Sequence, residues 1–275
     1  MILVGVDGSR AGLDAVGWAA REAGLRGVPL TVAHAMPRWA YETETGRLAE
    51  VAGWMREGGR TVLAAAEERA RRERPDVDLK TAFLPDDPRT ALIDAAADAE
   101  LLVVGGHGVG GVRGMLVGSV AYGVAGHAPC DVVVVRRPPS PPSGEIVAGV
   151  DGSPASPRVL EFALAEARLR GARLHAVHAS DRARPGGFDP EGSDGPRVLR
   201  ERLAALRADH PDVPIVEEVV PGHPAELLRQ AASGADLLVV GSHGYGTLAG
   251  MILGSISHEL VHRAPGPLAV VRSPR

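Results

Sequence analysis

The chain has 275 residues, of which 45% are hydrophobic and 23% charged, a composition typical of a soluble globular protein and too apolar for a disordered one. The net charge is −4, from 30 basic and 34 acidic side chains, which argues against nucleic acid or an anionic membrane as the main partner. No apolar run approaches the ~20 residues of a membrane span, the chain starts with a strand-like segment rather than a signal peptide, and Cys130 is the single cysteine, so neither disulfides nor cysteine clusters are expected. We therefore expect a cytoplasmic protein.

Short apolar strands alternate with helical segments through the first half of the chain. Strands are expected at residues 2–6, 29–35, 77–84, 101–105 and 131–136. The segments with helical spacing are residues 11–26, 59–73, 89–99 and 119–126. Because the strands are nearly continuous runs of Val, Ile and Leu, they predict a parallel sheet covered on both faces.

The second half of the chain repeats the first. Val-Gly-Val-Asp-Gly-Ser at residues 4–9 returns as Ala-Gly-Val-Asp-Gly-Ser at 148–153, and Leu-Leu-Val-Val-Gly-Gly-His-Gly at 101–108 returns with one substitution at 237–244. Its strands are expected near residues 146–150, 173–179, 213–220, 237–241 and 268–272. The first copy has extra residues between about 36 and 74. The repetition predicts two copies of one fold.

A proline-rich segment separates the two copies. Pro-Pro-Ser-Pro-Pro-Ser-Gly at residues 138–144 cannot lie within a helix or a central strand, and we interpret it as a stiff, extended linker. The domains are then residues 1–137 and 145–275. With right-handed crossovers, each is predicted to be a doubly wound α/β domain, a five-stranded parallel sheet in the order 3-2-1-4-5 flanked by helices.

Ligands of such sheets bind beyond the carboxyl ends of the strands, where the winding reverses, here between the first and fourth strands. The best-matched repeated segments follow these two strands. The second of them reads Gly105-x2-Gly108-x9-Gly118-Ser119 in the first copy and Gly241-x2-Gly244-x9-Gly254-Ser255 in the second. Glycines let backbone N–H groups approach an anion, and the Gly-Ser pair starts the next helix, where its groups can cap the helix or bind phosphate.

The glycine stretch differs from the common phosphate-binding motifs. A P-loop ends in Gly-Lys-[Ser/Thr], whereas Lys80, the sole lysine, follows Leu79. The dinucleotide fingerprint follows the first strand rather than the fourth. A polyphosphate would therefore be neutralised by backbone N–H groups, a helix terminus and a divalent cation such as Mg²⁺. Arg113 could assist in the first copy, and Ala249 takes its place in the second.

The Val-Asp-Gly-Ser turn and the Gly-x2-Gly-x9-Gly-Ser loop together resemble the universal stress protein family, in its tandem-domain, ATP-binding branch. The resemblance covers nearly the whole chain, apart from the linker and residues 36–58. It implies the five-stranded doubly wound fold and ATP as the ligand, with adenine near the ends of strands one and two and phosphates in the glycine loop.

The resemblance also implies a role for individual residues. Asp7 and Asp151 would contact adenosine, and Ala35 and Ala179 would offer backbone groups to adenine. The glycines and serines of both loops would cradle ribose and phosphates. The Asp-Gly-Ser turns can equally cap the first helix of each copy, and the two roles can coexist.

Several histidines are open to more than one interpretation. His107 and His243 lie in the glycine loops, where they could respond to phosphate charge or simply face solvent. His34 and His178 end the second strands, as structural or pocket-wall residues. The helix after the second loop carries His258, Glu259 and His262, which we interpret as a solvated helix face rather than a zinc site.

The favoured function is a stress-response protein that binds ATP in one or both copies and acts as a nucleotide-dependent regulatory module. A slow ATPase or phosphotransferase is less favoured, because catalysis needs a base and a metal site and the nearby candidates have no evident partner. A module for cAMP or AMP also suits a loop without lysine. The fifth strands are expected at sheet edges. The resemblance implies that such edges join domains, as a pseudo-dimer of the two copies and as a homodimer.

Overall fold

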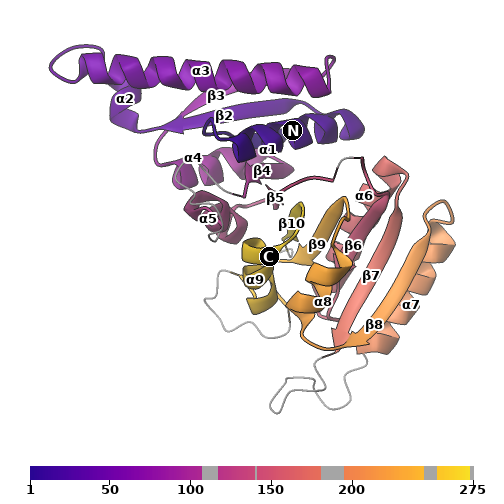
Figure 1. The fold of residues 1–275 in the computed structure, drawn as a ribbon. Coiled ribbons are helices and arrows are strands. Elements are labelled where there is room, and N and C mark those ends of the chain that lie inside the picture. Colours follow the sequence, from indigo (N-terminus) through magenta and orange to yellow (C-terminus); the bar gives the residue numbers. More distant parts are fainter. Residues whose placement is uncertain (107–116, 140, 181–194, 245–252, 273–275) are drawn as a thin grey trace. The chain divides into compact units, whose positions relative to one another are not determined.

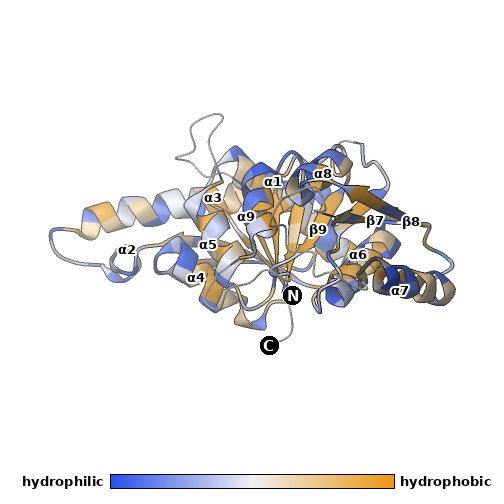
Figure 2. Cartoon of the chain, turned by 90° about the horizontal axis from the view of Figure 1, so that it is seen from below, coloured by the Kyte–Doolittle hydropathy of each residue, from blue (hydrophilic) through white to orange (hydrophobic). Residues whose placement is uncertain are grey.

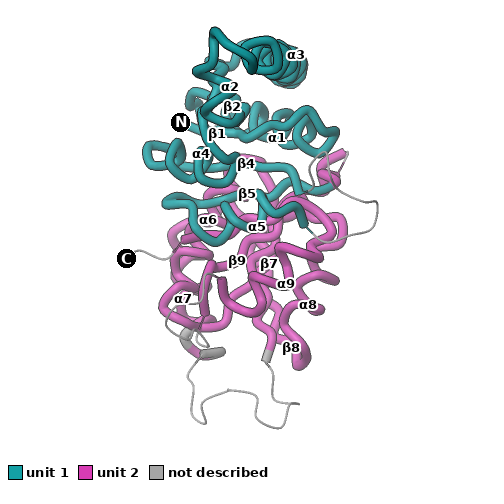
Figure 3. The backbone as a smooth tube through the Cα atoms, turned by 90° about the vertical axis from the view of Figure 1, so that its left-hand side faces the viewer, with its two compact units in different colours: residues 1–136 teal, residues 137–275 magenta. Residues whose placement is uncertain are grey.

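The computed structural model describes residues 1–106, 117–139, 141–180, 195–244 and 253–272. The chain divides into two compact units, residues 1–136 and 137–275 (Figure 3). The proposed linker at 138–144 lies at the start of unit 2, and its stiffness stays a prediction. Each unit is described by itself.

Unit 1 alternates strands and helices (Figure 1). Its elements are β1 (Ile2–Gly5), α1 (Arg10–Arg26), β2 (Leu30–Met36), α2 (Arg38–Glu42), α3 (Ala49–Glu73), β3 (Leu79–Pro85), α4 (Pro88–Ala95), the 3-10 turn η1 (Ala96–Asp98), β4 (Leu101–Gly105), α5 (Ser119–His127) and β5 (Asp131–Val135). The strands pair in the order β3-β2-β1-β4-β5, all in parallel. Helix α1 packs beside α3, and α4 beside α5, which gives the two helical layers of a doubly wound sheet.

Unit 2 repeats this plan. Its elements are β6 (Glu145–Gly149), α6 (Ser156–Arg170), β7 (Arg173–Ser180), α7 (Gly195–Asp209), β8 (Ile215–Pro221), α8 (Pro224–Ala231), β9 (Leu237–Gly241), α9 (Ser255–Arg263) and β10 (Leu268–Val271). The parallel order is β8-β7-β6-β9-β10. The predicted order 3-2-1-4-5 is therefore confirmed in both units. In each, the winding reverses between the strand that starts the unit and its fourth strand.

The strands carry the core because their side chains are apolar on both faces. Leu101, Leu102 and Val103 of β4 are fully buried, and so are the corresponding Leu237 and Val239 of β9. Figure 2 shows β9 in the hydrophobic colour, whereas helix α7 carries much of the hydrophilic colour. Two central strands buried on both sides fix their own register. They also fix the positions of the loops that follow them.

Helix α3 is longer than expected. The sequence predicted a start at residue 59, the second glycine of the Gly58-Gly59 pair, but the helix begins at Ala49. Tertiary contacts override the weak helix propensity of this pair. Arg56 Nη1 donates to the carbonyls of Ala40 at 2.7 Å and Thr43 at 2.9 Å, which joins the first turns of α3 to the end of α2.

The two adjacent glycines of α3 face different surroundings. A Cβ added at Gly58 would meet nothing within 4 Å, whereas one at Gly59 would lie 2.6 Å from Phe83 Cε1 and 3.0 Å from Met36 Cε. Gly59 therefore lets α3 lie close to β2 and β3. The aromatic side chains of the same segment do not cover core, since Trp54 is 70% exposed.

We predict opposite effects of alanine at these neighbouring positions. Gly58→Ala should raise the free energy of unfolding by about 0.5–1 kcal/mol, because alanine restricts the unfolded chain and favours the helix. Gly59→Ala should lower it by about 1–3 kcal/mol through overpacking. Urea denaturation of the two variants checks the pair, and equal shifts of the same sign would contradict this packing of α3.

Candidate functional site

The end of β4 meets the start of α1 through their backbones. A Cβ at Gly105 would lie 2.6 Å from the Ala11 carbonyl oxygen and 2.9 Å from the Gly12 nitrogen. Because both are backbone atoms, neither can move aside as a flexible side chain would, so the approach requires glycine here. The contact places the start of the first glycine loop beside the turn that contains Asp7.

Each glycine loop returns to the point where it began. In unit 1, Gly106 N donates to Val135 O at 2.9 Å and Gly118 N donates to Gly106 O at 3.0 Å. In unit 2, Ser242 N donates to Val271 O and Gly254 N to Ser242 O, both at 2.8 Å. These bonds close the base of each loop at the carboxyl end of the fourth strand. Gly108, His107 and Arg113 lie outside the described residues.

The helices that follow the loops start without a side-chain cap. Gly118 and Gly254 are the N-cap residues of α5 and α9, with extended backbones and no side-chain cap hydrogen bond. Ser119 and Ser255 are the first helical residues, and both are exposed. Of the two roles left open for these serines, the N-cap position is taken by the preceding glycine instead. First-turn N–H groups carry the positive end of a helix dipole, and here they lie at the base of the loop.

The Asp-Gly-Ser turn of unit 1 contains a standard helix cap. Asp7 Oδ1 accepts a hydrogen bond from Ser9 N at 3.0 Å, and Ser9 Oγ accepts one from Gly12 N at 3.1 Å. Ser9 is thus the N-cap of α1, as the capping interpretation predicted, while Asp7 braces the turn and remains exposed. Its carboxylate lies on the surface beside the end of β1.

The equivalent turn of unit 2 is braced more tightly. Asp151 Oδ1 accepts from Ser153 N at 2.9 Å and from Ser156 Oγ at 3.1 Å, and Ser156 Oγ accepts from Gly152 N at 3.0 Å. Ser156 takes the place that Gly12 has in unit 1. A Cβ at Gly12 would lie 2.9 Å from Asp7 Oδ1. Ser156 is not among the site residues predicted from the sequence, although the Gly-to-Ser difference between the copies is its signal.

In unit 2 the residues from two strand ends come together. A Cβ at Gly244 would overlap Asp151 Oδ2, so the first turn after β6 touches the loop after β9. Gly254 lies close to the same residue, since a Cβ added there would be 3.7 Å from Gly244 N. Ser257 Oγ of α9 donates to the Gly241 carbonyl at 2.5 Å and holds the helix against the strand end.

Two repeated histidines have a structural role. Nδ1 of His34 lies 2.8 Å from Val6 O, and Nδ1 of His178 lies 3.0 Å from Val150 O. A carbonyl only accepts hydrogen bonds, so Nδ1 carries the proton in both rings. The bonds join the second strand of each unit to the residue before Asp7 or Asp151. Ala35 and Ala179 directly follow these histidines and are half-buried. His243 has its Nδ1 3.1 Å from Ser242 Oγ.

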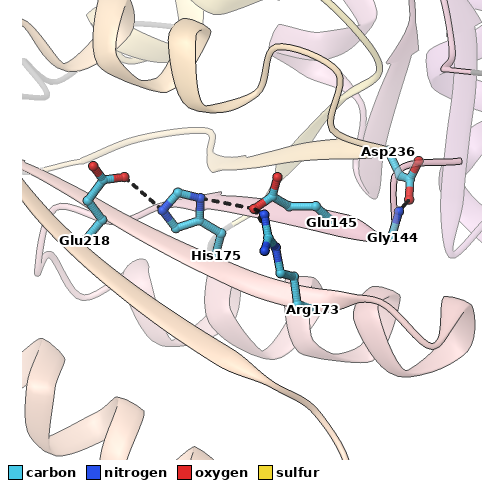
Figure 4. Close-up of polar contacts among 6 residues, drawn as sticks. All are labelled: Gly144, Glu145, Arg173, His175, Glu218 and Asp236. Atoms are coloured by element: carbon cyan, nitrogen blue, oxygen red, sulfur yellow. Dashed lines mark hydrogen bonds and ion pairs between the residues drawn. The ribbon is translucent and has the colours of Figure 1, made fainter.

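A separate polar cluster joins three strands of unit 2 (Figure 4). His175 Nε2 lies 2.9 Å from Glu218 Oε2, and its Nδ1 lies 3.4 Å from Glu145 Oε1, which also accepts from Arg173 Nε at 2.9 Å. Unit 1 has Met1, Pro29, Thr31 and Ala82 at the corresponding positions. The cluster starts at the amino end of β6, away from the glycine loop. We assign it to strand pairing rather than to the candidate site.

The described part of the chain has no group of three or more His, Cys, Asp or Glu side chains that could hold a metal ion. In the same residues, none of the helices has both the length and the hydrophobicity to cross a membrane.

Comparison with known proteins gives consistent matches along the chain. The model of the universal stress protein family matches residues 1–136 and 143–272. A universal stress protein of Mycobacterium tuberculosis is 37% identical over 285 residues, covering 98% of this chain and 96% of the relative. Another from that species is 34% identical over 291 residues, with the same coverage of 98% and 96%. The crystal structure of a universal stress protein from Archaeoglobus fulgidus is similar in fold, with a TM-score of 0.78, 20% identity and coverage of 98% and 97%.

We predict unequal costs when the two structural histidines are replaced. His178 is buried, so His178→Phe leaves the Val150 carbonyl without its partner and should lower the free energy of unfolding by about 1–3 kcal/mol. His34 is half-buried, and water can replace its bond, so His34→Phe should cost less. Chemical denaturation of both variants checks the order. A larger loss for His34→Phe would contradict it.

Proposed function

The chain belongs to the universal stress protein family, and from this premise we propose that each unit binds one adenine nucleotide, with ATP as the physiological ligand. The site of each unit lies where its first and fourth strands end. The observation that carries the proposal is the shared loop base, Gly106–Gly118 in unit 1 and Ser242–Gly254 in unit 2. Both lie at the point where the sheet winding reverses.

In this proposal the two strand ends bind different parts of the nucleotide. Asp7 and Ala35 meet the adenosine portion in unit 1, as Asp151 and Ala179 do in unit 2. Gly105, Gly108, Gly118 and Ser119 hold ribose and phosphates in unit 1, and Gly241, Gly244, Gly254 and Ser255 do so in unit 2. Mg²⁺ would accompany the phosphates and supply the positive charge that the absent lysine does not.

The uncapped helix starts support a phosphate at this place. The N–H groups of the first turns of α5 and α9 need acceptors, and the N-cap residues, Gly118 and Gly254, have no side chain to provide one. Each helix has nine residues and presents its positive dipole end to the loop. A phosphate oxygen there would accept several N–H bonds at once, as in other anion sites at helix termini.

The braced carboxylates support the adenosine part. Asp7 and Asp151 are exposed, at the ends of β1 and β6, while their Oδ1 atoms are fixed by backbone N–H groups. A fixed acceptor at a strand end suits the hydroxyl donors of a ribose. A cytoplasmic protein of this kind would act by changing its interactions when nucleotide binds. ATP hydrolysis, or preference for cAMP or AMP, is the alternative to be distinguished by measurement.

We predict that a negative charge at a helix start strongly weakens nucleotide binding in that unit without loss of folding. Ser119→Asp should weaken binding in unit 1 by at least about thirtyfold, because like charges in contact cost several kcal/mol. The same aspartate should stabilise α5 through the helix dipole. Ser119→Asn is the neutral control of similar size, and Ser255→Asp makes the matching change in unit 2.

Calorimetric titration with ATP, ADP, AMP and cAMP checks this prediction on protein stripped of nucleotide. We expect two equivalents of ATP for the unchanged chain and one for each aspartate variant, with the melting temperature unchanged or higher. Failure of the unchanged chain to bind any adenine nucleotide at millimolar concentration would refute the proposal. Tighter binding of cAMP than of ATP would replace ATP as the ligand.

The two units should differ in how firmly they hold the nucleotide. Ser156→Ala removes the hydroxyl that fixes Asp151 and should weaken binding in unit 2 by about 0.5–1.5 kcal/mol, up to roughly tenfold. Unit 1 has Gly12 in this place, so its affinity should not change. Calorimetry in the Ser119→Asp background reports unit 2 alone. An unchanged affinity would show that the Ser156 hydroxyl has no part in the site.

A further inference from the structure

Helix α9 carries two histidines that nucleotide binding does not use. His258 and His262 lie one helical turn apart, and His258-Glu259-Leu260-Val261-His262 has the letters of the zinc-binding pattern His-Glu-x-x-His. From the sequence, this segment is expected to be a solvated helix face. In the structure His258 is exposed but His262 is half-buried, so the interpretation holds for only one of the two rings.

The two rings have the separation that a shared metal ion requires. Their centroids are 5.0 Å apart and their planes make an angle of 50°. A zinc ion binds imidazole nitrogen at about 2.0–2.1 Å, and the nitrogen is about 1.2 Å from its ring centroid, so two imidazoles on one tetrahedral ion have centroids about 5 Å apart. The observed spacing fits this value without movement of the helix.

The helix holds the pair in a fixed orientation. Leu260 and Val261, between the two histidines, are fully buried and set the rotation of α9 about its axis. The helix is regular from its start, since His258 N donates to Gly254 O at 2.8 Å as the first intrahelical hydrogen bond. Two ligands on one rigid turn lose little conformational freedom when they bind one ion, which favours chelation.

Glu259 does not act with these histidines as it would in a metallopeptidase. Its Oε1 lies 3.2 Å from Arg263 Nη1, so the carboxylate is engaged with the next turn of the helix. Unit 1 has Tyr122 and Gly126 at the positions of the two histidines. The pair is therefore specific to unit 2 and offers two protein ligands, with the other metal positions left for water or an added ligand.

We propose that His258 and His262 form a two-histidine site for a divalent transition metal, with Zn²⁺ the first choice and Ni²⁺ or Cu²⁺ as substitutes. Imidazole nitrogen is a good ligand for all three ions. The site uses neither the glycine loop nor Asp151, so it does not depend on the proposed nucleotide binding.

Calorimetric titration of ZnCl₂ into the nucleotide-free full chain tests the site. We expect the unchanged chain to bind one equivalent of Zn²⁺ at this pair and both His258→Asn and His262→Asn to lose it. Removing one of two linked ligands removes the chelate effect, which lowers the affinity roughly a hundredfold. His127→Asn, at the exposed end of α5, is the control and should keep that equivalent. Melting curves without metal show whether each variant is folded.

Cu²⁺ gives a second measurement that reports the ligands directly. Its electron paramagnetic resonance spectrum should show coupling to two imidazole nitrogens in the unchanged chain and in His127→Asn, but not in the two α9 variants. Identical zinc stoichiometry and copper spectra in all four proteins would overturn the proposal. If Ser255→Asp loses nucleotide binding but still binds zinc, the result supports a metal site that is independent of the nucleotide site.

Discussion

The close approach of backbone to backbone at the end of the fourth strand is the constraint on which the candidate site depends. Gly105 lies against the Ala11 carbonyl, a contact that any side chain would prevent. Strands β1 and β4 pair in parallel, with Gly5 opposite Val104, so the loops that follow them leave the sheet at the same edge. The loop closed by Gly106 and Gly118 then lies beside the Asp7 turn. The N–H groups to which we assign the proposed anion binding are placed by this arrangement of the backbone.

The two units use one scaffold and differ in the side chains placed on it. Unit 2 braces its aspartate with Ser156 where unit 1 has Gly12, and it holds α9 to β9 with Ser257 where unit 1 has Ala121. It also carries the His258–His262 pair. A fold can keep its core while side chains at separate places change, and these three differences fall on unit 2.

The sheet order could be predicted from the sequence because continuous apolar runs such as Leu-Leu-Val-Val-Gly are typical of central parallel strands, which are buried on both faces. The start of α3 could not be predicted, because the low helix propensity of Gly58 and Gly59 indicates a helix boundary at this pair. In the structure Gly59 lies inside the helix, where it packs against Phe83. For the candidate site, the strand ends and loops were predictable from their repetition. The brace of Asp151 by Ser156 and the proton position on His34 depend on distances of a few ångström between side chains, which spacing in the sequence does not specify.

The most direct test of the account follows backbone amides during nucleotide addition. In a ¹⁵N-labelled chain titrated with ATP, we expect the largest shifts at the amides of Gly8, Ser119 and Val120 in unit 1 and of Gly152, Ser255 and Ile256 in unit 2. The amides of Glu145 and His175, near the opposite strand ends, should stay in place. Shifts concentrated around Glu145 and His175, with the helix starts unmoved, would contradict a site at the reversal of the sheet winding.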